Sequence, residues 1–283
     1  MENLYQTAKD CFLIADPDVK IARTNEIASM WFSGKMEWLE GDAPQNLQEP
    51  GRLDKPEIVM PRDLKKRKPH TETGRAALIH SLAHIELTAV NLAWDAIYRY
   101  RDMPKEYYAD WVQCAKEEAG HFALLRQKLR DMGFDYGSFA VHGELWKMAI
   151  TTKDDLTDRM AIVHRVFEAR ALDVIPHTLG RFEQLNDTEM VKILNLICND
   201  EIGHVNSATR WFRYRCEQQG MNPDTTFVAL LKHYLTSPLA GPFNYQARKQ
   251  SGFNQFELDY LDSQCPNIKR QAEISKNTDN NFM

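Results

Sequence analysis

The sequence predicts an all-α protein built on a four-helix bundle in which one long connection crosses between two helical hairpins. Two observations favour this fold. Residues 133–153 separate two pairs of long segments, and within each pair the joint is short enough to make an antiparallel hairpin. Each segment also keeps the apolar spacing of a helix. The four expected helices span about 74–101, 105–132, 154–184 and 187–219.

Residues that begin, end or bend helices occur where these boundaries need them. Gly133 and Gly220 follow the second and fourth segments, where a glycine commonly ends a helix. Asn186 or Asp187 is expected to cap the fourth segment. Pro176 lies inside the third segment and predicts a kink there.

The N-terminal 70 residues are expected to form helices and a strap that pack on the bundle. Residues 1–38 have helical spacing, with a capping signal in ADPDVKIAR. Residues 41–70 contain five of the twelve prolines, which predicts an extended strap. The strap ends in a basic run that favours a solvated loop, with a polyanion contact as the alternative: Lys65, Lys66, Arg67 and Lys68.

The chain after the bundle, which is expected to span 71–220, divides into an ordered and a disordered part. Residues 221–265 should form a C-terminal helix, NPDTTFVALLKHYL, and a loop that caps one end, SPLAGPFNYQARKQSGF. The polar tail, residues 266–283, is expected to be disordered.

Composition limits the classes of protein that the chain can belong to. Of 283 residues, 43% are hydrophobic, and the net charge of -5 does not favour a general nucleic-acid or membrane-surface protein. No apolar run reaches 18 residues, and no secretory signal is visible in the first twenty. The five cysteines are scattered and form no C-x-x-C pair. These features predict a cytoplasmic protein without disulfides or a membrane span.

One pentapeptide pattern occurs twice, as EEAGH at 117–121 and DEIGH at 200–204. Positions i and i+3 share a helix face, so Glu118 lies beside His121 and Glu201 beside His204. Apolar residues extend both faces, and these faces should therefore point into a core. A buried carboxylate without compensation is costly, so each pair requires a source of positive charge.

The other two helices carry matching acids. Glu86 and Glu168 lie in apolar stripes of their own, and each precedes the Glu of the following pentapeptide by nearly the same distance, 32 and 33 positions. In a hairpin with a short turn, this offset places each acid level with the Glu-x-x-His of its partner helix. The chain therefore contains two copies of a hairpin made of a Glu helix and a Glu-x-x-His helix.

Four carboxylates and two imidazoles in one core predict two divalent metal ions, whose charge would balance the acids. Mixed oxygen and nitrogen ligands suit iron, manganese or zinc better than calcium or magnesium. The alternative is a buried network of salt bridges. The expected ligands are Glu86, Glu118, His121, Glu168, Glu201 and His204.

Neighbouring residues are candidates for supporting roles. Glu117 and Asp200 could each accept the free N–H of a ligand imidazole, or could be solvated acids. His164 lies one turn before Glu168 and could support it or bind metal, the alternative being a buried histidine. The sequence does not decide whether Gly120 and Gly203 allow close helix approach or substrate access.

Other candidates carry a weaker signal. His80 and His84 pair with each other but lie more than 100° around the helix from Glu86, which disfavours them as ligands. Cys114 and Cys198 precede their ligand Glu by one turn and are better explained as small core residues.

These residues resemble the ferritin-like di-iron carboxylate superfamily, in which two helices each supply a Glu and two each supply a Glu-x-x-His. Further segments make the chain similar, over residues 1–262, to an uncharacterised ferritin-like family, a domain of unknown function. They are the strap, HSLAHIEL, EEAGHF, HRVFEARALD, NDEIGHV and PFNYQARKQSGF. The resemblance implies a ferritin-like fold and a metal site, with two iron ions per chain, or with manganese or a mixed iron/manganese pair in their place. It implies no particular reaction.

Two classes of function follow. The first is an oxidoreductase that activates O2 to hydroxylate or oxidise an unknown small molecule or nucleoside, with an electron donor if it is a monooxygenase. A modified tRNA base is a possible substrate by analogy with the di-iron tRNA hydroxylase. The alternative is a ferroxidase or iron-handling protein. The segments outside the bundle favour a monomeric or dimeric enzyme, with Asn244 and Arg248 as weak candidates for a substrate pocket. The alternative for Arg248 is a structural salt bridge.

Overall fold

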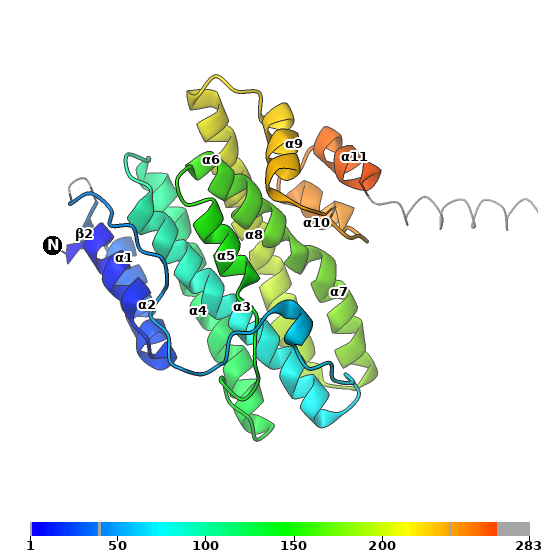
Figure 1. The fold of residues 1–283 in the computed structure, drawn as a ribbon. Helices are drawn as coiled ribbons and strands as arrows, with labels where there is room; N and C mark the ends of the chain where they lie inside the picture. Colours follow the sequence, from blue (N-terminus) through cyan, green and yellow to red (C-terminus); the bar gives the residue numbers. More distant parts are fainter. Residues whose placement is uncertain (1, 39–40, 238, 265–283) are drawn as a thin grey trace, which may run out of the picture. The chain divides into compact units, whose positions relative to one another are not determined.

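The computed structural model describes residues 2–38, 41–237 and 239–264 (Figure 1). Helices dominate this part of the chain, as the sequence predicts. The predicted disordered tail, 266–283, lies outside the described residues.

The elements are β1 (Glu2–Asn3), α1 (Leu4–Leu13), α2 (Pro17–Phe32), β2 (Met36–Glu37), a 3₁₀ turn η1 (Pro61–Asp63), α3 (Glu72–Arg99), α4 (Lys105–Asp131), α5 (Glu144–Thr151), α6 (Leu156–Arg159), a π-helix η2 (Met160–Phe167), α7 (Ala169–Gln184), α8 (Thr188–Gln218), α9 (Pro223–Tyr234), α10 (Tyr245–Gln250) and α11 (Gln255–Ser263).

The chain divides into two compact units, residues 1–154 and 155–283. The division falls inside the range that the sequence assigns to one bundle, between the two predicted hairpins. Each unit therefore has one of the two hairpins as its centre: α3 with α4 in the first, and η2 and α7 with α8 in the second.

The hairpin of the first unit follows the predicted boundaries closely. Thr71 caps α3 by accepting a hydrogen bond from the Gly74 backbone N–H. Gly133 has a φ of +78° and ends α4, with the Phe134 N–H donating to the Leu129 carbonyl. This is the left-handed glycine ending that the sequence indicates.

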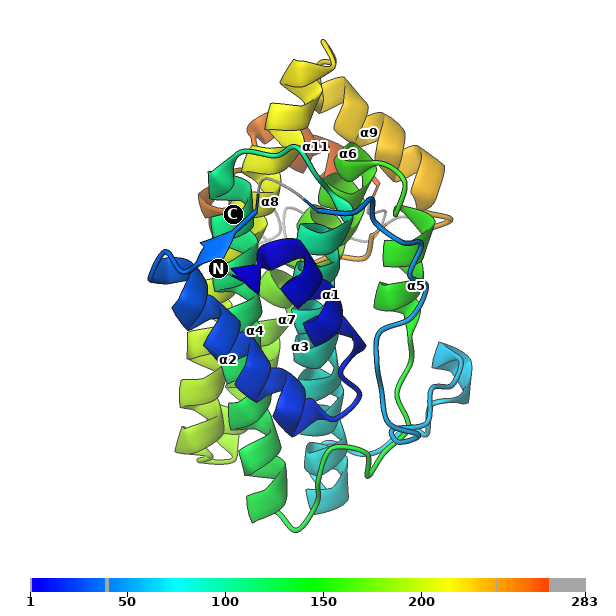
Figure 2. The ribbon, with the colours of Figure 1, turned by 90° about the vertical axis from the view of Figure 1, so that its left-hand side faces the viewer.

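Helices α1 and α2 cover this hairpin, α1 against α3 and α2 against α4 (Figure 2). Asp16 and Pro17 begin α2 as the ADPDVKIAR signal predicts. Lys20 of α2 is only 2% exposed, and its Nζ donates to the Phe12 and Gly51 carbonyls and to Asn91 Oδ1. A buried ammonium thus ties α1, α2, α3 and the strap together through neutral acceptors.

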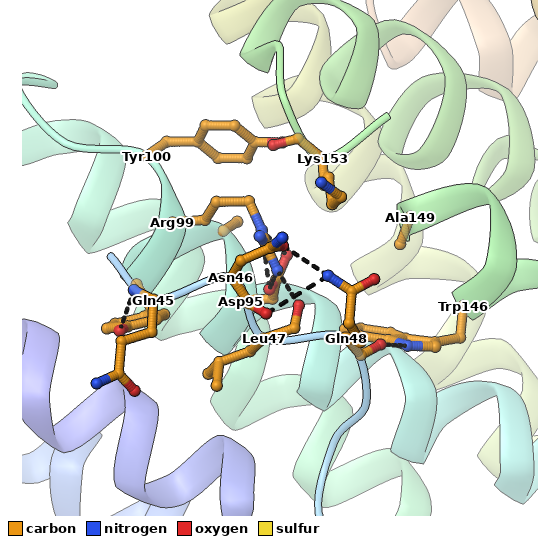
Figure 3. Close-up of polar contacts among 12 residues, drawn as sticks. Gln45, Asn46, Leu47, Gln48, Asp95, Arg99, Tyr100, Trp146, Ala149 and Lys153 are labelled. Atoms are coloured by element: carbon orange, nitrogen blue, oxygen red, sulfur yellow. Dashed lines mark hydrogen bonds and ion pairs between the residues drawn. The ribbon is translucent and has the colours of Figure 1, made fainter. Parts of the chain in front are cut away.

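The strap is extended, as its prolines predict, and side chains of α3 and α5 hold its backbone (Figure 3). The Tyr98 hydroxyl accepts from the Gln45 N–H at 2.7 Å, and Trp146 Nε1 donates to the Gln48 carbonyl at 2.8 Å. Arg99 pairs with Asp95 at 2.6 Å and also donates to the Leu47 carbonyl. The strap therefore satisfies part of its polar backbone against side chains, and it also forms a short β-bridge in which the Val59 N–H donates to the Val141 carbonyl and the Val141 N–H to the Glu57 carbonyl.

The first long helix of the second unit departs from the prediction in its geometry. It runs from α6 through η2 to α7, but residues 160–167 form a π-helix, in which the Glu168 N–H donates to the Val163 carbonyl five positions earlier. The helix continues through Pro176. Since proline has no N–H to offer the carbonyl four positions earlier, that of Leu172, the side chain of Asn244 donates to this carbonyl instead, at 3.2 Å.

The C-terminal helices α9, α10 and α11 pack around α8 and η2, where the sequence predicts one helix and a capping loop. Two buried ion pairs fix them. Arg165 of η2 donates to both carboxylate oxygens of Glu257 of α11, at 2.8 and 2.9 Å. Arg248 of α10 pairs with Asp173 of α7 at 2.7 Å. All four side chains are at most 1% exposed.

Helix α3 has the length and mean hydropathy of a membrane span, 1.2 over 18 residues. The core helix of a soluble protein has the same properties, and 56% of this window is buried within the protein. The polar residues Glu86, Asn91 and Asp95 are also buried on α3. These features favour a core helix.

Candidate metal centre

Three of the predicted ligands meet in the first unit. His121 Nδ1 lies 3.2 Å from Glu86 Oε2 and 3.3 Å from Glu118 Oε2. The exposed fractions of Glu86, Glu118 and His121 are 3%, 0% and 1%. One nitrogen thus faces two carboxylates from two helices, the arrangement that the offset of 32 positions predicts.

The electrostatics of this cluster show a demand for positive charge. Burial, together with the neighbouring Glu118 carboxylate, raises the pKa of Glu86 to about 8. Burial lowers the pKa of His121, but hydrogen bonds to Glu118 and Glu86 outweigh this and raise the pKa to about 11. Two carboxylates at this spacing need a proton or another cation between them.

The second unit forms two pairs of predicted residues. His164 Nδ1 lies 2.8 Å from Glu168 Oε1, and His204 Nδ1 lies 3.8 Å from Glu201 Oε2. All four are buried, with Glu168 the most exposed at 8%. In each pair, as in the first unit, the δ nitrogen of the histidine faces the carboxylate.

The donor atoms of the first unit fit a transition metal. The ligand atoms of Glu86, Glu118 and His121 all lie within 4.8 Å of one another, a spacing that one ion could bridge. Two carboxylate oxygens and one imidazole nitrogen form the mixed set that iron, manganese or zinc accepts. The predicted supporting residues Glu117 and Asp200 are both half-buried, and Glu117 accepts from Gln113 Nε2 at 2.6 Å. Their role toward the imidazoles stays a prediction.

The two candidate pocket residues have structural partners. Asn244 caps α10 and bonds the Leu172 carbonyl, and Arg248 is fully buried in its ion pair with Asp173. For Arg248 this ion pair is the structural role that the sequence left as the alternative. A contact of either side chain with substrate stays a prediction.

The residues with weaker signals lie as follows. His80 Nε2 accepts from the Gly137 N–H at 2.9 Å, and burial lowers the pKa of both His80 and His84 to about 4. Cys114 is buried and Cys198 partly so. A Cβ added at Gly120 or Gly203 would meet no described atom within 4 Å, so close contact with a described neighbour does not explain either glycine.

Tyr136 contacts side chains of α3 and α4, the two helices that carry the ligands of the first unit. Its hydroxyl lies 2.8 Å from His84 Nδ1, and its ring meets the edge of Phe122, the residue after His121, at 5.2 Å. Tyr136 belongs to the loop after α4, where no helical periodicity reveals the direction of a side chain.

Comparison with known proteins adds a family without a known activity. Residues 13–259 match the model of a family described as "Protein of unknown function (DUF455)". An "Uncharacterized protein" of Haemophilus influenzae is 40% identical over 215 residues, which cover 74% of this chain and 75% of that protein. No solved structure matches. Since the matched residues include both hairpins and all six predicted ligands, the chain belongs to the DUF455 family.

Proposed function

We propose that the protein is a dinuclear metal oxidoreductase of the ferritin-like kind, in which the two hairpins together bind two iron ions, or manganese in their place. The observation that carries this proposal is the buried cluster of the first unit, where Glu86 and Glu118 face the same nitrogen of His121. The second unit carries the same residue types at nearly the same offset, with Glu168, Glu201 and His204.

The total charge of the six predicted ligands supports two metal ions rather than one. The six residues bring four carboxylates and two imidazoles, and two divalent ions would neutralise the four acids. A network of salt bridges alone would need cationic side chains at the same place. Two buried arginines of the second unit have carboxylate partners elsewhere, since Arg165 is paired with Glu257 and Arg248 with Asp173.

A pair of iron or manganese ions would supply redox chemistry toward O2. The side chains of this protein would hold and enclose such ions. Glu86 and Glu118 offer oxygens from two adjacent helices, and His121 offers Nδ1 between them. Apolar neighbours on the same helices, including Ala83, Val90 and Leu125, are fully buried and keep water from the cluster.

The reaction class is the oxidation of an organic substrate by O2. For hydroxylation the balance is R–H + O2 + 2 H⁺ + 2 e⁻ → R–OH + H2O, so an external electron donor is required. The substrate is a small molecule or a nucleoside, and a modified tRNA base is one candidate. The basic run of the strap would then contact the polyanion, and Lys65, Lys66 and Lys68 are exposed there.

Metal content and O2 consumption test the proposal together. The native protein should hold about two iron or manganese ions per chain and consume O2 after anaerobic loading with Fe(II). The variant Glu118→Gln/Glu201→Gln keeps the shape of both side chains and should lose the metal. The matched control, Glu106→Gln/Glu183→Gln, changes exposed glutamates on α4 and α7 and should keep it.

The assembly state separates the enzyme from the iron-handling alternative. A monomer or dimer that consumes O2 with a substrate-dependent rate supports the oxidoreductase. A shell of many subunits that accumulates oxidised iron far beyond two ions per chain would support ferroxidase or storage chemistry instead. Zinc alone, or no metal in a native protein as stable as the variant, would contradict both.

A further inference from the structure

Residues 58–68 of the strap combine exposed apolar side chains with a local excess of positive charge. Ile58 and Met60 are 43% and 51% exposed. The segment also contains Arg62 and the basic run, and its one acid, Asp63, lies 3.9 Å from Arg62. Figure 2 shows the η1 turn near the centre of this segment, in light blue, standing out from α3 and α4. The segment is therefore accessible to a partner from the solvent side.

The rest of the first unit holds the backbone of this segment. The β-bridge fixes its start at Val59. Near its end, the Arg67 guanidinium lies 4.7 Å from the centre of the Phe139 ring. The Lys68 carbonyl accepts a hydrogen bond from the Thr71 hydroxyl at 2.8 Å. The exposed side chains of the basic run thus extend from a fixed backbone rather than from a free loop.

The lysines of the basic run are not used within the described part of the protein. Lys65, Lys66 and Lys68 are exposed, and among the described residues no carboxylate pairs with any of them. The positive excess remains when the flanking acids are counted, because residues 52–75 contain eight basic and four acidic residues. The net charge of -5 of the whole chain therefore hides a basic surface, which favours an anionic partner.

The exposed apolar side chains lie on one side of the strap. The β-bridge and the extended backbone of Met60 make side chains alternate here, so Ile58 and Met60 point to one side and Glu57 to the other. Residues 51–71 contain no Phe, Tyr or Trp on which a nucleic-acid base could stack. Aliphatic side chains beside exposed lysines favour a lipid surface over nucleic acid.

We propose that residues 58–68 dock the protein on the surface of a bilayer that contains anionic phospholipids. The basic run lies over the phosphate groups, and Ile58 and Met60 enter the boundary between the headgroups and the acyl chains. The lysines need not converge on one headgroup, because an anionic bilayer presents negative charge over its whole surface. The inference does not rest on the proposed metal chemistry, since none of these residues is a candidate ligand.

Co-sedimentation of the full chain with lipid vesicles tests the proposal. The native protein should bind vesicles made of an equal mixture of phosphatidylcholine and phosphatidylserine, but not vesicles of phosphatidylcholine alone. Higher salt should weaken the binding, because it screens the charges. The variant Lys65→Gln/Lys66→Gln/Lys68→Gln should weaken it roughly 100-fold, or about fivefold for each lysine removed from an anionic surface.

Two further variants separate this surface from general effects of charge and folding. The control Lys35→Gln/Lys192→Gln/Lys249→Gln makes the same change of net charge at exposed lysines elsewhere and should leave vesicle binding close to native. Met60→Ser removes an exposed apolar side chain without changing the charge. It should weaken binding severalfold at unchanged thermal stability, because less apolar area then enters the bilayer.

The proposal would be overturned if the native protein did not bind the phosphatidylserine vesicles, or if the lysine variant bound them as well as the native protein does. Binding that Met60→Ser leaves unchanged would also overturn it, since charge alone would then suffice. Saturable binding of tRNA that the lysine variant loses, without vesicle binding, would assign the surface to nucleic acid instead. The metal-site variant Glu118→Gln/Glu201→Gln should bind vesicles normally, so this test and the metal test can fail independently.

Discussion

The two units place the same residue pattern on helices of different geometry. In the first unit α3 and α4 are regular, and Glu86, Glu118 and His121 meet through helical spacing alone. In the second unit a π-helix precedes Glu168 and places His164 against its carboxylate. The first unit has Leu82 at the corresponding position, four residues before Glu86. The comparison teaches that the repeat preserves the donor types while one half gains an additional histidine.

Individual buried cations also differ in how they are neutralised. Arg165 and Arg248 of the second unit each have a carboxylate partner, as Arg99 of the first unit does. Lys20 of the first unit has only neutral oxygen acceptors among its described hydrogen bonds. Arg165 and Lys20 should therefore affect stability through different mechanisms, and the next predictions use this contrast.

The largest expected effect is at the ion pair of the second unit. Arg165→Met leaves the fully buried Glu257 carboxylate without its main partner, which should lower the free energy of unfolding by roughly 3–5 kcal/mol. Urea denaturation measures this loss. The double variant Arg165→Met/Glu257→Met should recover most of it, and a double variant as unstable as the single one would show that packing of the arginine stem matters instead.

Lys20 of the first unit should make the free energy of unfolding depend on pH. Burial lowers the pKa of Lys20 to about 8, against 10.5 for an unperturbed lysine. Between these two values the unfolded chain binds the proton and the folded chain does not, so stability rises with pH by up to about 3 kcal/mol. Below pH 8 both the folded and the unfolded chain carry the proton, and the folded protein bears the full free-energy cost of burying the charged ammonium.

Unfolding measured from pH 7 to 10.5 in the native protein and in Lys20→Met isolates this contribution, because other groups titrate equally in both. The difference in stability between the two proteins should shift in favour of the native protein by that amount as pH rises. A constant difference across the range would mean that Lys20 keeps its ordinary pKa in the fold.

The additional histidine should affect metal binding in the second unit more than its fold. If His164 orients Glu168, then His164→Gln should weaken the binding of one of two ions by about 10–100-fold, the usual effect of losing a residue that supports a ligand. Competition with a chelator measures both affinities. The matched change Leu82→Gln alters the corresponding position of α3 and should leave the affinities closer to native, and equal effects of the two variants would remove the proposed asymmetry.

The smallest expected effects concern the two pentapeptide glycines. Gly120→Ala and Gly203→Ala add a Cβ where no described atom lies within 4 Å, and each should raise stability by about 0.5–1 kcal/mol because glycine weakens a helix interior. Thermal unfolding checks this. A variant that is more stable but has a lower turnover would indicate that the open space beside the glycine admits substrate.

Periodicity and capping residues predicted the helices well, because both act over a few residues. Gly133, Asp187 and Gly220 end or begin helices where expected, and the offset between Glu86 and Glu118 placed the first cluster correctly. The π-helix could not be predicted, since a wide turn depends on the packing around it rather than on MAIVHRVF alone. The pairing of Arg165 with Glu257, 92 positions apart, depends in the same way on how the C-terminal helices fold back.

The most direct test of the account is the metal stoichiometry of three proteins purified under identical conditions: the native chain, Glu118→Gln and Glu201→Gln. Each variant removes one carboxylate from a different unit. The account predicts about two iron or manganese ions per native chain and a loss of metal in both variants, because the ions need donors from both repeats. Native stoichiometry in either variant, or a native protein without these metals, would contradict it.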